Sequence, residues 1–186
     1  MSDQKWEPQK RAHSLARFIG TVKLASESEN DKLPYGRRSS AACCRELQIP
    51  EYNPPSEQIK AILEKHKTVA IVGLSPKPER DSYKVAKYLK ENHYRIVPVN
   101  PGQKEILGDT CYPNLKAIPF PVDVVDIFRR PEAIPPVVDD AIEIGAKVVW
   151  MQVGLAHNQA ANKAQNAGLE VVMNKCMKIE HMNMLK

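Results

Sequence analysis

The amino-acid sequence predicts an α/β domain in which helices cover both faces of a mostly parallel, five-stranded sheet. Two observations lead to this prediction. Short apolar segments rich in valine and isoleucine alternate with amphipathic segments from residue 56 to residue 174, and the connections between them are of ordinary length. Strands separated by helices require parallel β-α-β crossovers, which place helices on both faces of one sheet. We therefore expect a Rossmann-like three-layer domain.

Five segments are predicted to be strands. Each is a short apolar run dominated by β-branched residues, which is typical of a strand buried on both faces. The runs are 68–74 (TVAIVGL), 95–100 (RIVPVN), 122–128 (VDVVDIF), 147–154 (KVVWMQVG) and 170–174 (EVVMN).

Four segments, one before the first strand and three between strands, are predicted to be helices. Ser56 is a suitable N-cap for the first, and His66 and Lys67 place positive charge near its C-terminal end. In the third, Pro135 and Pro136 are expected to disrupt the beginning of the helix. The segments are 56 to about 67, 82–93, 131–145 and 158–168, and residues 102–121 are expected to hold one short helical turn at most.

Residues 1–55 differ from the rest of the chain. Apart from a possible short helix over 13–25 they lack a strong apolar period, so they can bury little apolar surface. We expect a flexible or partly packed arm here, followed by the domain over 56–186. Several arginines and serines in the arm resemble an organellar transit peptide, but its acidic residues argue against one. The chain does not open with an apolar secretory signal, and we expect a cytoplasmic protein.

Composition narrows the possible partners. The net charge of +5 and the pI of about 9.0 are compatible with an anionic ligand. The basic residues are spread along the chain and aromatic residues make up 6%, so a nucleic-acid surface is not expected. No apolar run approaches the roughly 18 residues that a membrane span requires. Cys43, Cys44, Cys111 and Cys176 lack zinc-ligand spacing, and we interpret them as reduced thiols without a metal.

The turn after the first strand carries the strongest functional signal. In parallel sheets, ligands bind beyond the carboxyl ends of the strands where the strand order reverses. Gly73 permits a sharp turn there, Lys77 and Arg80 are cations, and Ser75 and Ser82 offer hydroxyl groups close to the start of a helix. The stretch predicts a site for several phosphate groups. The alternatives are that Gly73 serves only the turn and that the two cations are solvated surface charges.

The second strand ends in Asn100 and Pro101. A site for NAD would place an aspartate or glutamate there to bind the ribose, and its first turn would carry G-x-G-x-x-G, of which only Gly73 is present. Both differences argue against NAD.

The third and fourth strands end in further candidates. Phe128 stands beside Arg129 and Arg130, a combination suited to an adenine with a nearby phosphate, unless the arginine pair is simply exposed at a helix start. The fourth strand contributes Gln152 and Gly154.

The sequence does not reveal a catalytic set. Asp123 and Asp126 do not form an obvious acid/base pair. His157 is interpreted as a capping or surface residue, and the lone Cys176 as a buried thiol. His181 stands near the C-terminus without a recognisable partner.

An ordered set of segments resembles a known family. VAIVGLSPKPERDSYKVAKYLKENHYRIVPVNP, GDTCYPNL, VDVVDIFRRPE, IGAKVVWMQVG and NKCMKIEH together are similar to the small single-domain CoA-binding proteins. These are stand-alone relatives of the CoA-binding domain in succinyl-CoA synthetase alpha chains and ADP-forming acyl-CoA synthetases. The resemblance spans about Ser56 to Leu185 and implies coenzyme A at the carboxyl edge of the sheet.

The resemblance also implies roles for the candidate residues. The pyrophosphate would meet the turn formed by Gly73, Leu74 and Ser75, and near it would lie Lys77, Arg80 and Ser82. The cofactor would be flanked by Asn100 and Pro101. Near the nucleotide would lie Phe128, Arg129 and Arg130. Because coenzyme A carries a 3′-phosphate, extra cations and a missing ribose carboxylate are consistent with it.

The larger relatives have a further domain with a phosphorylated histidine and an ATP-grasp partner, neither of which we identify in this sequence. Synthesis of acyl-CoA by this chain alone is therefore not expected. The predicted function is binding of coenzyme A or an acyl-CoA, as a carrier, sensor or regulatory module. An NAD(P)-linked oxidoreductase, a scaffold without a ligand, and an enzyme that acts on CoA thioesters through Cys176 or His157 remain alternatives. A homodimer or another protein partner is also possible.

Overall fold

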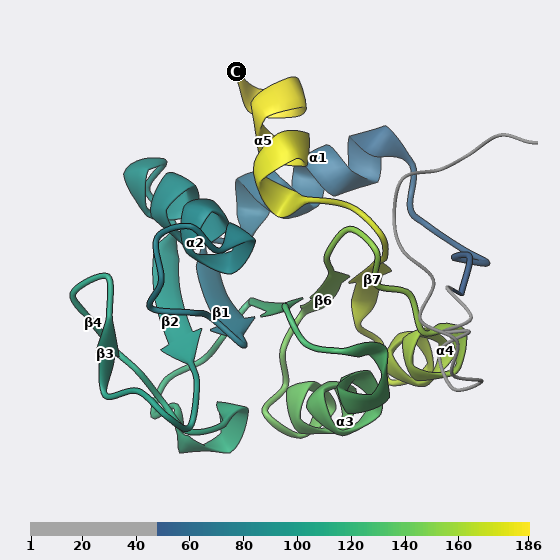
Figure 1. Cartoon of the computed structure of the whole chain (residues 1–186). Coiled ribbons are helices and arrows are strands. Elements are labelled where there is room, and N and C mark those ends of the chain that lie inside the picture. The colour runs from purple at the N-terminus through teal and green to yellow at the C-terminus, as the bar shows by residue number, and fades with distance from the viewer. Residues whose placement is uncertain (1–47) are drawn as a thin grey trace, which may run out of the picture. The chain divides into compact units, whose positions relative to one another are not determined.

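The computed structural model describes residues 48–186 and centres on one five-stranded sheet (Figure 1). All neighbouring strands in the sheet are parallel, and their spatial order is β2-β1-β5-β6-β7. The strand order therefore reverses between β1 and β5. The predicted α/β three-layer fold is confirmed. The strands are β1 Thr68–Val72, β2 Arg95–Val99, β5 Val124–Ile127, β6 Val148–Met151 and β7 Glu170–Val172.

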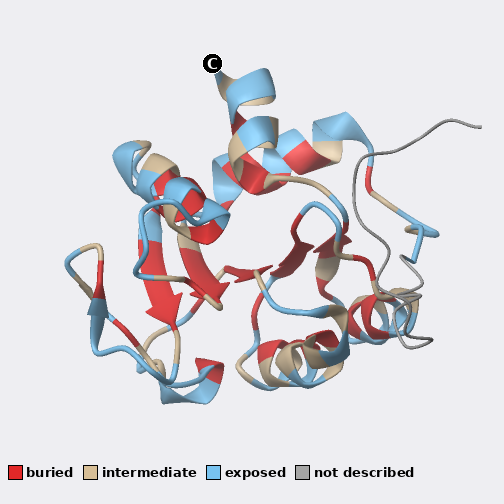
Figure 2. Cartoon of the chain, viewed as in Figure 1, coloured by how far each residue is buried: buried red, intermediate tan, exposed pale blue. Residues whose placement is uncertain are grey.

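Helices cover both faces of the sheet. On one face, α1 (Ser56–Lys65), α2 (Asp81–Glu91) and α5 (Met177–Leu185) contribute buried residues to a single apolar cluster. On the other face, α3 (Ile134–Glu143) and α4 (Asn158–Asn166) do the same. Figure 2 shows the strands buried between these two layers.

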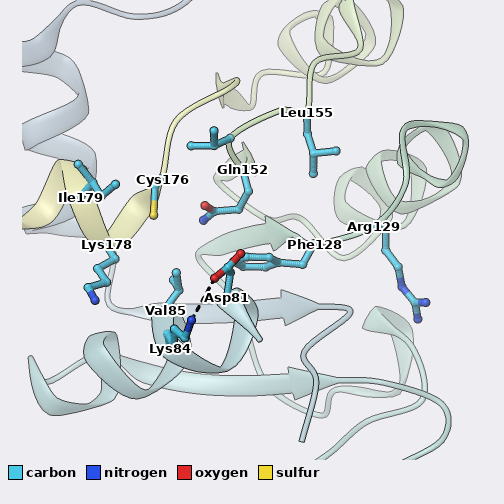
Figure 3. A pocket seen from close by; sticks show the side chains of 11 residues that line it. Asp81, Lys84, Val85, Phe128, Arg129, Gln152, Leu155, Cys176, Lys178 and Ile179 are labelled. Atoms are coloured by element: carbon cyan, nitrogen blue, oxygen red, sulfur yellow. Dashed lines mark ion pairs between the residues drawn. The ribbon is translucent and has the colours of Figure 1, made fainter. Parts of the chain in front are cut away.

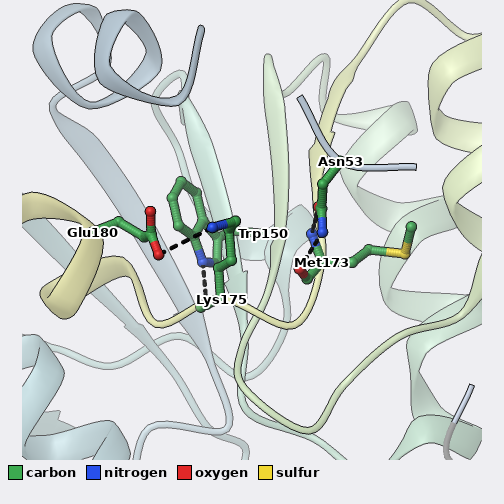
Figure 4. A network of polar contacts seen from close by, with 5 residues as sticks. All are labelled: Asn53, Trp150, Met173, Lys175 and Glu180. Atoms are coloured by element: carbon green, nitrogen blue, oxygen red, sulfur yellow. Dashed lines mark hydrogen bonds and ion pairs between the residues drawn. The ribbon is translucent and has the colours of Figure 1, made fainter. Parts of the chain in front are cut away.

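Alternation along the strands divides the core between the two faces. On β1, Val69 and Ile71 pack under α1 and α2, whereas Ala70 and Val72 face α3. On β6, the side chain of Trp150 is completely buried, and its indole nitrogen donates a hydrogen bond to the backbone oxygen of Lys175, 2.7 Å away (Figure 4). The loop that leads into α5 is thus attached to β6.

Two elements are additions to the predicted set. The first is α5, which was not predicted because its own apolar residues are spread around the helix axis and form no distinct apolar face. Met177 and His181 are buried, whereas Ile179 and Met182 are exposed. The second is a hairpin of β3 (Glu105–Ile106) and β4 (Asp109–Thr110) within the segment 102–121. The one short helical turn expected there is present as a 3-10 turn over Leu115–Ala117.

The third helix begins later than the sequence pattern predicts. A 3-10 turn covers Pro131–Ala133, and α3 starts at Ile134. Pro135 and Pro136 therefore fall in the first turn of α3, where backbone N–H groups have no partner inside the helix and none is lost. The prolines shift the start of the α-helix without breaking it.

A short segment before α1 is attached to the edge of the sheet. The side-chain amide of Asn53 donates to the backbone oxygen of Met173 at 2.9 Å and accepts from its backbone N–H at 2.7 Å (Figure 4). The side-chain amide of Asn53 thus forms with the backbone of Met173, just beyond β7, the pair of hydrogen bonds that a neighbouring strand would form. The predicted arm, with its possible helix over 13–25, and Cys43 and Cys44 lie largely or wholly outside the described residues, so the boundary at residue 56 stays a prediction.

Membrane-spanning helices and metal-binding clusters are absent from the described part of the chain. Within residues 48–186, no helix combines the length and the apolar character needed to cross a bilayer. Within the same range, His, Cys, Asp and Glu side chains do not form a cluster of three or more that could hold a metal ion.

Candidate functional site

Gly73 forms the turn at the point where the strand order reverses. Its φ is +90°, and its backbone N–H donates to the backbone oxygen of Val99 at 2.9 Å. A Cβ atom at this position would lie 2.6 Å from the backbone oxygen of Phe128 and 3.2 Å from the Arg129 side chain. Only glycine allows the end of β1 to pass this close to the end of β5.

The loop after Gly73 is held by its own hydroxyl groups. The hydroxyl of Ser82 accepts a hydrogen bond from the backbone N–H of Ser75 at 3.1 Å. The hydroxyl of Ser75 accepts one from the backbone N–H of Lys77 at 3.2 Å. Leu74 is completely buried in the core beneath the loop and is not among the residues that line the cavities described below. Lys77 and Arg80 are exposed, and within residues 48–186 neither forms an ion pair.

A cavity of about 360 Å³ lies over this turn. It is placed at the N-terminal end of α2, where free backbone N–H groups and the helix dipole favour an anion. Asp81 opposes this preference, but its carboxylate pairs with Lys84 at 3.5 Å. The lining residues are Gly73, Ser75, Arg80, Asp81, Ser82 and Phe128.

A larger cavity of about 580 Å³ adjoins the first and shares Asp81 and Phe128 with it (Figure 3). Its walls are mostly apolar and come from α2, the ends of β5 and β6, and the start of α5. The loop before α5 contributes Cys176, and α5 contributes Lys178 and Ile179. The two cavities together suit a long ligand with an anionic part and a less polar arm.

A third cavity, of about 240 Å³, lies on the opposite side of Arg129, between the ends of β1 and β2 and helix α3. Pro101 and Leu115 line it, and Arg129 lines both this cavity and the large one. The exposed Arg129 therefore stands at the junction of the cavities, beside the Gly73 turn. Arg130, which precedes the 3-10 turn before α3, lines none of the three.

Asn100 holds two loops together. Its side-chain amide donates to the backbone oxygen of Leu74 at 2.9 Å, and its side-chain oxygen accepts from the backbone N–H of Gly102 at 3.0 Å. Both ends of the side chain are therefore engaged with the protein. We conclude that Asn100 fixes the position of the Gly73 turn relative to the end of β2.

Gln152 and Asp126 form a buried polar pair beneath the large cavity. The Gln152 side-chain nitrogen donates to both carboxylate oxygens of Asp126, at 2.9 and 3.0 Å. Burial raises the pKa of Asp126 to about 7, and the hydrogen bonds from Gln152 and from the backbone at Ile127 oppose that rise. Gly154, by contrast, is exposed, and its backbone N–H donates to the Asn174 side chain at 2.8 Å.

The two histidines with candidate roles lie apart from these cavities. His157 caps α4, because its ring nitrogen accepts from the backbone N–H of Ala160 at 3.2 Å. His181 is buried against Tyr88 and Tyr94, with its ring nitrogen 3.0 Å from the Tyr88 hydroxyl. Its pKa is lowered by burial and then by the nearby charges of Lys67 and Lys186. Of the candidate residues Cys176, His157 and His181, Cys176 lines the large cavity.

The sequence predicted the strand-end residues of the site but not those supplied by α5. Gly73, Ser75, Arg80, Ser82, Phe128 and Arg129 come together around the first cavity and its junction, as the strand-end rule implies. Lys178 and Ile179 were missed because α5 was not predicted, and Asp126 was missed as a partner of Gln152. The strand positions of Asp126 and Gln152, on neighbouring strands with side chains on the same face, carried a signal for that pair.

Comparison with known proteins identifies the family. Residues 67–182 match the family model described as a CoA binding domain, and the chain belongs to this family. The matched range contains β1 through most of α5, and with it all three cavities.

Individual relatives agree with this assignment. The chain is 40% identical to the uncharacterized protein YneT of Bacillus subtilis over 69% of its own length and 96% of that protein. A hypothetical protein from Pyrococcus horikoshii OT3 has a solved structure that is 45% identical, with a TM-score of 0.71, covering 75% of this chain and 98% of that one. Acetate–CoA ligase (ADP-forming) I of Archaeoglobus fulgidus is 26% identical over 60% of this chain, but that match spans only 18% of the ligase.

Proposed function

We propose that the protein binds coenzyme A or an acyl-CoA across the three cavities, and acts as a carrier, sensor or regulatory module. The observation that carries the proposal is the junction at Gly73, Phe128 and Arg129, from which a small anion-favouring cavity, a long apolar cavity and a third cavity extend. A ligand with phosphates in its middle, an adenosine at one end and a flexible arm at the other has this shape. Membership of the CoA binding domain family supports the same choice.

The polar groups suggest how such a ligand lies. The pyrophosphate would occupy the cavity over Gly73 and Ser75, close to the N-terminal end of α2 and to Arg80. The adenosine would lie on the side of Pro101 and Arg129, where Arg129 can pair with a phosphate, and Lys77 and Arg130 are the further cations nearby. The pantetheine arm would then extend past Phe128 and Gln152 toward Cys176.

A thermal unfolding experiment tests the proposal against an NAD(P) enzyme. A ligand that binds only the folded protein stabilises it by about 2.7 kcal/mol at a hundredfold excess over its Kd. We expect coenzyme A to raise the unfolding midpoint and NAD or NADP to leave it unchanged. Equal shifts, or no shift with coenzyme A, would contradict the proposal. Native mass spectrometry of the protein purified from cells would identify any acyl group that remains bound.

One observation favours a second candidate function. Because Cys176 lines the cavity assigned to the arm, its thiol can attack the carbonyl of a bound thioester, which would move the acyl group to Cys176 and release coenzyme A with a free thiol. Intact-mass analysis after incubation with acetyl-CoA tests this. An added acetyl group that is absent from Cys176→Ser would support acyl transfer, and unmodified protein would leave binding as the function.

A further inference from the structure

Gln152 presents only one end of its amide to the large cavity. Gln152 is 5% exposed, and its side-chain nitrogen donates hydrogen bonds to the completely buried carboxylate of Asp126. In the sheet, Asp126 stands between Ile71 on β1 and Trp150 on β6, neither of which carries a charge. The carboxylate therefore has the Gln152 amide as its side-chain partner.

This pairing fixes the orientation of the amide. Above pH 7, where Asp126 is ionised, its carboxylate only accepts hydrogen bonds, so the nitrogen of Gln152 faces Asp126, as it does in the structure, and the side-chain oxygen points away from it. Within residues 48–186, no hydrogen bond to this oxygen is found, yet no buried polar side-chain atom lacks a partner. The oxygen is therefore open to the cavity that Gln152 lines (Figure 3).

We propose that the Gln152 side-chain oxygen selects ligands that carry an N–H or S–H donor in this cavity, with Asp126 as the positioning residue. The inference rests on the proposed function. Coenzyme A carries such donors in the two amide groups and the thiol of its arm, whereas adenosine 3′,5′-bisphosphate has no arm. Phe128, Leu155 and Ile179 are apolar residues of the same cavity lining. The Asp81 carboxylate also lines the cavity but is paired with Lys84, so the Gln152 oxygen is the uncharged acceptor that an entering arm can use to satisfy a donor.

The test replaces Asp126 by asparagine, which has nearly the same shape. The new side-chain amide can donate to the Gln152 oxygen, so the Gln152 amide is free to turn its N–H groups toward the cavity. A donor then replaces the acceptor that the ligand needs. Calorimetric titration of Asp126→Asn should show a Kd for coenzyme A roughly three- to tenfold higher than that of the wild type, the effect of one hydrogen bond. The Kd for adenosine 3′,5′-bisphosphate should stay the same.

The double variant Asp126→Asn with Gln152→Glu is the matched rescue. It exchanges the two functional groups, so that an amide at position 126 donates to a carboxylate at position 152 whose second oxygen faces the cavity. We expect its Kd for coenzyme A to return toward the wild-type value, which a merely structural role of Asp126 would not produce. Gln152→Met, which keeps the side-chain length and removes the acceptor, gives an independent measurement if Asp126→Asn does not fold.

Comparison of coenzyme A with adenosine 3′,5′-bisphosphate distinguishes failure of this inference from failure of the proposed function. If folded Asp126→Asn and Gln152→Met bind both ligands as the wild type does, or weaken both equally, the role of the Gln152 oxygen is refuted while coenzyme A binding stands. If the wild type binds neither ligand, the proposed function fails and this inference fails with it. Loss of affinity for coenzyme A alone, with recovery in the double variant, supports the inference.

Discussion

Replacement of Gly73 by alanine tests the geometry on which the site depends. An alanine at φ +90° costs about 1–2 kcal/mol of stability, because its Cβ crowds the adjacent backbone. In addition, its Cβ would meet the backbone oxygen of Phe128 at 2.6 Å, so the ends of β1 and β5 must move apart. Overpacking of this kind typically costs a further 1–3 kcal/mol, which gives a total loss of roughly 2–5 kcal/mol. The same movement displaces the anion cavity, and we expect affinity for coenzyme A to fall at least tenfold.

Gly168→Ala is the matched control. Gly168 has a φ of +87°, but a Cβ there would meet no atom within 4 Å. This variant should lose only the backbone term, about 1–2 kcal/mol, and bind coenzyme A as the wild type does. Urea unfolding measures the stability of both variants, and calorimetric titration measures the affinity. Equal losses of stability in the two variants, or unchanged affinity in Gly73→Ala, would refute the reasoning.

Three further predictions follow from single contacts. Arg129→Ala should weaken coenzyme A binding by roughly 1–3 kcal/mol in a titration, the value of a charge-assisted hydrogen bond, and Arg130→Ala should weaken it less; a larger effect at Arg130 would contradict the placement of the nucleotide. Because the pKa of Asp126 is raised to about 7 in the folded protein, the folded state binds this proton more tightly than the unfolded chain, so the contribution of Asp126 to stability should be greatest below about pH 4, fall as the pH rises to about 7 and then level off. Urea unfolding across that range should show that Asp126→Asn lacks this decline; an identical pH profile would show that the carboxyl titrates normally. Asn53→Ala should lower the unfolding free energy by roughly 1–3 kcal/mol, because it leaves the backbone polar groups of the buried Met173 without the partners they have in Asn53. An unchanged urea midpoint would show that water replaces the amide.

The sequence was sufficient to predict the sheet and the edge at which the site lies. Buried parallel strands require uninterrupted β-branched runs, and these are visible without knowledge of tertiary contacts. The order in which the strands pair is a tertiary property. The alternation of strands and helices thus predicted the crossovers, and the structure added the reversal between β1 and β5.

The features that were not predicted have two separate physical causes. The helix α5 lacks a polar face along its length, since Ile179 and Met182 are exposed while Met177 is buried, and a periodicity argument needs such a face. The hydrogen bonds of Asn100 were not predicted either: both ends of its side-chain amide bind loop backbone. Which hydrogen bond a polar side chain makes depends on the loops that approach it, and strand-end position alone does not specify them.

The most direct test of the central claim is a crystal structure of the protein grown with coenzyme A. We expect the pyrophosphate over the Gly73 turn, beside Arg80 and the N-terminal end of α2, and the arm along the cavity that Gln152 and Cys176 line. Coenzyme A bound elsewhere on the protein, with the cavity over Gly73 lacking any phosphate, would contradict the account.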